Sequence, residues 1–152
     1  MDASFQKFKE FTQKRKDKVP QISIIPAERK NRFQYVGGQM ADEKLYAVPN
    51  SAETMLRYDT KSGVIDFFGS FSDADFKWTG GCIYDNNLYM FPRSENSLLK
   101  YRPEANMFEK LPCDFKYENE HHYGGICTNE GVIYQPPRNT NHILKWDIKN
   151  RM

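Results

Sequence analysis

Short runs of alternating hydrophobic and polar residues fill most of the chain, and the same runs recur after about 43 to 45 residues. A shift by the smaller interval places Tyr35-Val36-Gly37-Gly38 on Trp78-Thr79-Gly80-Gly81, and the larger shift continues the match into a third copy. The recurring positions are Tyr35, Gly37, Tyr46 and Pro49 in the first copy, Trp78, Gly80, Tyr89 and Pro92 in the second, and Tyr123, Gly125, Tyr134 and Pro137 in the third. The repeat therefore sets the architecture of the chain.

Each copy is predicted to form four short strands. In the middle copy these strands cover residues 81–84, 88–91, 97–101 and 107–111, with Asp, Asn and Pro in the turns between them. Four strands joined by turns, repeated every ~43 residues, are typical of a β-propeller blade. We therefore predict an all-β fold with four-stranded blades of the β-propeller type in about three repeats. The glycines after each leading aromatic residue are expected to let the first strands pack closely near a central channel.

The repeat does not begin and end at the same strand. Residues 22–26 align with 65–69 and 108–112, which are fourth strands, so they are predicted to form a fourth strand that pairs outside the neighbouring blade. The strand at 142–146 in the third copy has an open edge in this scheme. Three blades are too few for a closed ring of ~4–8 blades. Two alternatives stay open: a homodimer that completes a six-bladed ring, and a fragment or degenerate relative of a longer propeller.

Residues 1–20 are predicted to form a basic, partly helical extension, and residues 21–152 the three blades. Phe5, Phe8 and Phe11 recur at a spacing of three, which favours one apolar helix face. Residues 1–32 carry nine Lys or Arg and four acidic residues, although the whole chain has a net charge of only +2. This extension either lies on the propeller, docks into a groove of a partner, or acts as a basic surface patch.

Composition limits the function classes. A net charge of +2 is too small to indicate nucleic acid as a partner. No apolar run reaches the ~18 residues of a membrane span, so no membrane partner is expected. The N-terminus lacks the apolar core of a signal peptide, and three cysteines are an odd number. We therefore predict an intracellular, cytoplasmic protein.

Candidate chemistry is sparse. Cys113, His121, His122 and Cys127 are the one grouping with metal-ligand types, but their spacing matches no standard zinc site. Cys82 falls on Cys127 in the repeat, which favours a packing role for both, and His121 and His122 are expected in an exposed loop between blades. Trp78, Tyr35 and Tyr123 are expected to be buried between blades. We predict no cofactor, no metal and no catalytic residue.

The repeat resembles the kelch family of β-propellers, in which a Leu/Ile-Tyr-x-x-Gly-Gly strand precedes a strand that ends in Tyr-Asp. Tyr58-Asp59 and Trp146-Asp147 match the second element, while Pro49, Pro92 and Pro137 replace the glycine pair of the first. The resemblance covers residues ~22–149 and implies a propeller fold that binds proteins. The expected function is a non-catalytic protein-interaction module. The alternatives are a glycan- or small-ligand-binding propeller and a fragment of a propeller enzyme.

Overall fold

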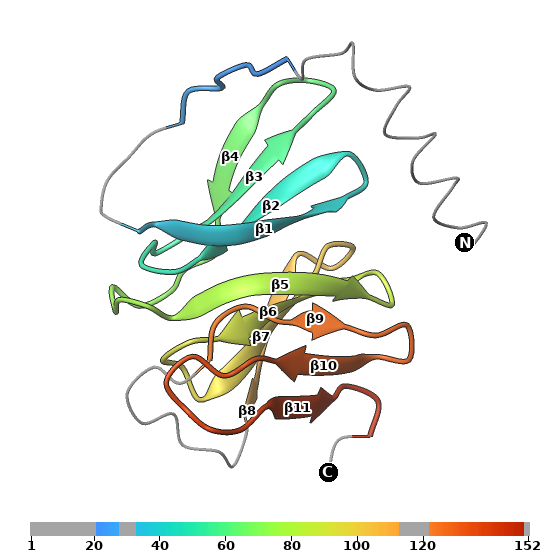
Figure 1. Ribbon diagram of the computed structural model, residues 1–152. Helices are drawn as coiled ribbons and strands as arrows, with labels where there is room; N and C mark the ends of the chain where they lie inside the picture. Colours follow the sequence, from blue (N-terminus) through green and yellow to red (C-terminus); the bar gives the residue numbers. More distant parts are fainter. Residues whose placement is uncertain (1–20, 28–32, 113–121, 151–152) are drawn as a thin grey trace, which may run out of the picture.

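A computed structural model describes residues 21–27, 33–112 and 122–150 of the chain (Figure 1). These residues form strands and turns and contain no helix, which confirms the all-β prediction. Within the same ranges, no helix is long and apolar enough to cross a membrane. The helix expected before Pro20 lies outside the described residues.

Three antiparallel sheets follow one another along the chain, and we call them blades 1 to 3 (Figure 1). Blade 1 contains β1 (Tyr35–Ala41), β2 (Lys44–Pro49), β3 (Met55–Asp59) and β4 (Ile65–Phe68) in that order. Blade 2 contains β5 (Trp78–Tyr84), β6 (Asn87–Pro92), β7 (Ser97–Arg102) and β8 (Met107–Pro112). Blade 3 contains β9 (Ile126–Cys127), β10 (Val132–Gln135) and β11 (Leu144–Asp147), with β10 between the other two.

The first strands of the three blades lie next to one another (Figure 1). They can approach closely because glycines, which have no side chain, occupy the positions where the strands meet. Gly37, Gly80 and Gly124 have φ values of 80°, 63° and 70°, a region that favours glycine. A Cβ atom on Gly37 would stand 2.9 Å from the Cα of Gly80, and one on Gly80 would stand 3.5 Å from the Cα of Gly124. Glycine is therefore required for the close stacking of β1 on β5.

Two apolar cores fill the spaces between the blades. The core between blades 1 and 2 is mainly aromatic: the ring of Tyr101 lies 5.8 Å from that of Tyr46 and 4.7 Å from that of Phe108. The core between blades 2 and 3 contains Tyr89, Phe91 and Ile133, all of them buried. Ring pairs at these separations stabilise a core beyond the area that they bury. Blade 2 thus packs one sheet face against blade 1 and the other against blade 3.

The register of blade 3 corrects the expected equivalence of Cys82 and Cys127. Blades 1 and 2 turn from their first to their second strand through two residues with positive φ, Asp42-Glu43 and Asp85-Asn86. In blade 3 the N–H of Thr128 donates to the oxygen of Val132 at 2.8 Å, which closes a turn one residue longer.

The pairing of β9 therefore slips by one residue. Cys82 pairs with Tyr89 in blade 2, whereas Ile126 pairs with Tyr134 in blade 3. A slip of one residue moves each side chain of a strand to the other face of its sheet. Ile126 consequently takes the place of Cys82, and Cys127 faces blade 2.

Residues 21–27 form no strand within the single chain, so the expected pairing of residues 22–26 outside the neighbouring blade stays a prediction. Ile22 and Ile24 are 91% and 90% exposed. A strand is stable only when its backbone groups pair with a neighbour, and the segment has none here. Figure 1 shows it in blue beyond β4, at the opposite end of the molecule from β11.

Candidate functional site

The aromatic residue that opens each blade is held by a hydrogen bond to the start of the third strand. Trp78 is fully buried, its Nε1–H donates to the carbonyl of Ser97 at 3.0 Å, and its ring lies 5.5 Å from Phe71. In blade 1 the hydroxyl of Tyr35 bonds to the side chain of Thr54, and burial raises the pKa of Tyr35 above its ordinary value. These residues pin the first strand to the third.

His122 plays this part in blade 3, where the sequence alignment had placed Tyr123. His122 bridges to Pro137 as Trp78 pairs with Pro92, and its Nε2 lies 3.2 Å from the carbonyl oxygen of His142. His122 is 0% exposed, so the expectation of an exposed loop is wrong for it. Tyr123 is 44% exposed, which corrects the expectation that it is buried.

The same offset exchanges the glycines of blade 3. Gly124, not Gly125, joins the stack with Gly80, while Gly125 packs against the backbone of β10 as Gly81 packs against the backbone of β6. Before β9 the third copy is therefore one residue shorter than the second, and its turn is one residue longer. The two changes cancel, so the sequence alignment at a constant shift hides them.

The repeat tyrosines and prolines otherwise lie where the pattern places them. Pro49 and Pro92 end β2 and β6, and Pro137 follows β10. Tyr46 and Tyr89 are buried between blades, whereas Tyr134 is 37% exposed on the outer face of blade 3. Tyr134 differs because no described blade covers that face.

The weak metal candidates are not assembled into a site in the described part of the chain. Cys113 and His121 lie outside the described residues. His122 is engaged with the carbonyl of His142, and the Sγ of Cys127 donates to the carbonyl of Thr128 at 3.3 Å. In residues 21–27, 33–112 and 122–150, no group of three or more His, Cys, Asp or Glu side chains is placed to hold a metal ion.

Cys82 and Cys127 meet across the boundary between blades 2 and 3. Both belong to the apolar core there, and Cys82 is buried. Burial raises the pKa of the Cys82 thiol far above its ordinary value, and the neighbouring Cys127 raises it further. A thiol that stays protonated is a poor nucleophile, so Cys82 acts as a packing residue.

Substituting Phe for His122 should lower the free energy of unfolding by about 1 kcal/mol, the usual net value of one buried hydrogen bond. The ring would still fill the space, but the carbonyl of His142 would lose the partner it has at 3.2 Å. Urea denaturation measures the difference. Substituting Phe for Tyr123 is the control, because Tyr123 is partly exposed; equal losses in the two variants would contradict the pinning role of His122.

A cluster of aromatic rings and guanidinium groups lies at the end of the blades where the first strands begin and the second strands end. The guanidinium of Arg93 stands 4.1 Å from the ring centroid of Phe76 and 5.3 Å from that of Tyr123. The guanidinium of Arg138 lies 5.4 Å from the same Tyr123 ring. Phe33 extends the cluster, with its ring 6.3 Å from Phe76. We call Phe33, Phe76, Arg93, Tyr123 and Arg138 the aromatic–arginine patch.

Repeated backbone bonds position this patch. The N–H of Arg93 donates to the oxygen of Lys77 at 2.9 Å, and in blade 1 the N–H of Asn50 donates to the oxygen of Gln34 at 2.8 Å. Each bond ties the loop after a second strand to the residue before a first strand. Asn50, Arg93 and Arg138 occupy the same position after the repeat proline. That shared position is the sequence signal that could have identified the patch.

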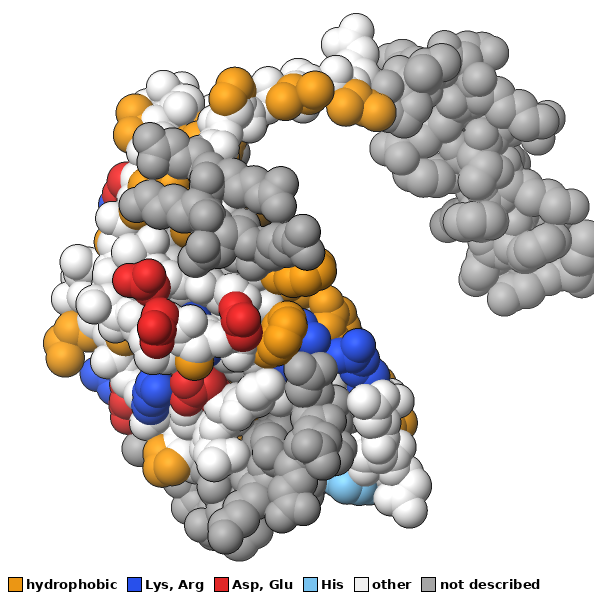
Figure 2. Space-filling view, turned by 90° about the vertical axis from the view of Figure 1, so that its left-hand side faces the viewer, with side chains coloured by type: hydrophobic (Ala, Val, Ile, Leu, Met, Phe, Trp, Pro, Cys, Tyr) orange, Lys and Arg blue, Asp and Glu red, His pale blue; other side chains and the backbone are white. Residues whose placement is uncertain are grey.

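Acidic side chains lie on the same end of the molecule, around Lys77. Burial lowers the pKa of Lys77, and the nearby carboxylates of Glu95, Asp75, Glu53 and Asp73 oppose this shift. Lys77 is 1% exposed and its Nζ donates to the carbonyl of Ala74 at 2.6 Å. Figure 2, which looks onto this end, shows red acidic side chains towards the left with some blue basic ones among them, and further blue side chains beside hydrophobic ones towards the right. The acidic side chains therefore gather on one side of this surface.

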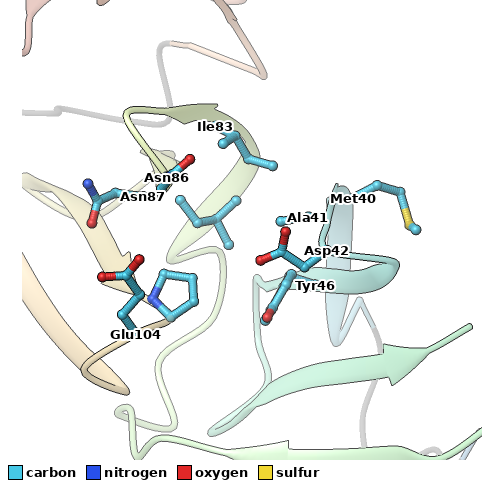
Figure 3. Close-up of a pocket in the computed structure, with 10 residues that line it drawn as sticks. Met40, Ala41, Asp42, Tyr46, Ile83, Asn86, Asn87 and Glu104 are labelled. Carbon is cyan, nitrogen blue, oxygen red and sulfur yellow. The ribbon is translucent and has the colours of Figure 1, made fainter. Parts of the chain in front are cut away.

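A cavity of about 420 Å³ lies at the opposite end, between blades 1 and 2 (Figure 3). Its walls include Met40, Tyr46 and Ile83, with the carboxylates of Asp42 and Glu104 at the turns. The residue equivalent to Ala41 in the next blade is Tyr84, whose ring lies 2.6 Å from where Gly131 would carry a Cβ atom. The equivalent space between blades 2 and 3 is thus filled by Tyr84. The cavity does not repeat there, as a ligand pocket built into every blade would.

Three short sheets that share closely packed first strands define the β-propeller class of fold. The structure is similar to virginiamycin B lyase from Staphylococcus aureus, with a TM-score of 0.54 and 13% identity over 79% of this chain and 43% of the lyase. It is also similar to a streptogramin B lyase, with a TM-score of 0.54 and 17% identity over 77% of this chain and 41% of that one. At these identities the likeness concerns the fold.

The chain spans less than half the length of these two structures. No protein-family model matches the sequence. A search of curated proteins finds no match either. The propeller class is therefore established by structure, and the kelch-like assignment within that class stays a prediction.

Proposed function

We propose that this chain is a non-catalytic protein-interaction module, and that its aromatic–arginine patch binds an acidic segment of a partner protein. The observation that carries the proposal is the alternation of guanidinium groups and aromatic rings from Phe76 through Arg93 and Tyr123 to Arg138. Loops held by a rigid scaffold often carry binding residues. Tyr and Arg are also enriched among the residues that dominate protein interfaces.

The exposed parts of the patch suit a carboxylate ligand. Phe33 is 66% exposed and Tyr123 is 44% exposed, so apolar surface is open to a partner beside the two positive charges. A guanidinium stacked on aromatic rings has a fixed orientation, and its N–H groups bond to a carboxylate in a bidentate manner. Arg93 is 7% exposed and supports the rings, whereas Arg138 is exposed and is the expected contact.

The acidic side of the same surface sets the orientation of the partner. Glu53, Asp73 and Asp75 would repel a uniformly acidic peptide and attract basic residues. The partner segment should therefore carry acidic and aromatic residues that reach the patch and basic residues that reach the acidic side. Electrostatic complementarity of this kind contributes mainly to specificity and to the association rate.

A labelled peptide with acidic and aromatic residues at one end and lysines at the other tests this proposal by fluorescence anisotropy. Substituting Ala for Arg138 should weaken binding roughly tenfold, about 1.4 kcal/mol, and binding should weaken further as salt is added. Substituting Ala for Lys61 is the matched control, because it removes one positive charge from the turn between β3 and β4. Equal binding by the Arg138→Ala variant and the unchanged chain would refute a role for the patch.

A further inference from the structure

The outer face of blade 1 carries apolar residues at the same positions as the blade 2 residues that pack against blade 1. Leu45, Tyr58 and Ile65 lie in register across blade 1, and Leu88, Tyr101 and Phe108 lie in the same register across blade 2. The blade 2 residues pack against blade 1 in the first core. The blade 1 residues point away from blade 2, and on the same face Phe67 is 43% exposed. Blade 1 therefore presents a surface suited to packing on another blade.

The outer face of blade 3 carries the complementary set. Tyr134 and Ile143 are 37% and 63% exposed. The residues at their repeat positions in blade 2, Tyr89 and Leu98, are each 3% exposed because blade 3 covers them. Tyr46 and Met55 of blade 1 are buried against blade 2 in the same way. The outer face of blade 3 is thus suited to packing against a following blade.

The open edge of blade 3 and the exposed residues 22–25 form a second complementary pair of surfaces. The described strands of blade 3 number three, with β11 at the edge of the sheet, whereas blades 1 and 2 each have a fourth strand. Residues 22–25 fall on β4 and β8 in the repeat, and Ile22 and Ile24 are almost fully exposed. An apolar strand-forming segment and an open edge are each hazards unless they pair.

We propose that two copies of this chain associate about a two-fold axis into a six-bladed ring. Blade 3 of each copy packs on the outer face of blade 1 of the other, and residues 22–25 of each copy pair with β11 of the other. The register follows from blade 2, where Tyr101 pairs with Phe108 and Leu99 with Lys110. Ile22 would then lie opposite Trp146, and Ile24 opposite Leu144. The second copy supplies the fourth strand by β-strand addition.

Light scattering on the full chain tests the association. The expected mass is about twice 17.9 kDa. Substituting Asp for Ile22 should shift the midpoint of dissociation to a concentration at least about a hundredfold higher, because Ile22 takes the repeat position of Phe108, which packs against an apolar core in blade 2, and a carboxylate would be buried there. Ile22 is 91% exposed in the single chain, so this substitution removes no contact within it. Substituting Asp for Val64, which is 57% exposed on the turn after β3, should leave the mass unchanged.

Paired cysteines test the register. The double variant Ile24→Cys/Leu144→Cys should form a disulfide between two copies under mild oxidation, seen as a covalent dimer in a non-reducing gel. The variant Ile24→Cys/Lys145→Cys should not, because adjacent residues of a strand point to opposite faces. A monomer at all concentrations, an unaltered dimer after Ile22→Asp, or a disulfide within one copy would each overturn the proposal.

Discussion

Substituting Ala for Trp78 should lower the free energy of unfolding by about 3–5 kcal/mol, the range for deleting a large buried aromatic side chain. Trp78 is 0% exposed and packs in the core between blades 1 and 2 with Met90 and Leu99. The substitution would leave a void beside Phe71, and the carbonyl of Ser97 would lose the N–H that it accepts at 3.0 Å. Both changes loosen the first strand of blade 2.

Denaturation by urea at one fixed protein concentration measures this loss, because association would also contribute to apparent stability. Two variants separate the causes. Substituting Phe for Trp78 keeps most of the apolar volume but removes the indole N–H, so its cost should be smaller. Substituting Ala for Tyr35, which lies at the same repeat position but is half-buried, should also cost less. An unchanged transition in the Trp78→Ala variant would show that the ring does not support the core.

The sequence pattern was sufficient to predict the fold because hydrophobic and polar residues alternate along each strand and each turn carries residues that prefer turn conformations. Asp42-Glu43 and Asp85-Asn86 both adopt the positive φ that two-residue turns require. The pattern predicted the wrong register at the start of blade 3. One residue is missing before β9 and one is added in the turn between β9 and β10, so the total length of the repeat does not change. Only pairing of backbone groups shows that His122, and not Tyr123, takes the place of Trp78.

The candidate site was not predictable for a related reason. The sequence shows that Asn50, Arg93 and Arg138 share one repeat position, but it does not show that the loops of three blades converge. The stacking of Arg93 between Phe76 and Tyr123 depends on the angle between adjacent blades, which is set by packing. Residues 22–25 illustrate a further limit, since their strand pattern has no pairing partner within the described chain.

Substituting Ala for Gly37 should be nearly as damaging as the loss of Trp78, with a cost of about 3 kcal/mol. Gly37 has a φ of 80°, where an L side chain costs about 1–2 kcal/mol. The new Cβ would also stand 2.9 Å from the Cα of Gly80, and backbone cannot rotate away as a side chain can. The first strands of blades 1 and 2 would have to separate, which would open the core between them.

The chain offers a matched control that separates the two contributions. Gly63 has a φ of 74°, and a Cβ atom there would meet nothing within 4 Å. Gly63→Ala therefore carries the backbone strain alone, and its cost should be about 1 kcal/mol. The difference between the two variants in urea denaturation measures the close approach of β1 to β5. If Gly37→Ala costs no more than Gly63→Ala, the first strands do not stack through glycine, and the joining of blades 1 and 2 must depend on the aromatic core instead.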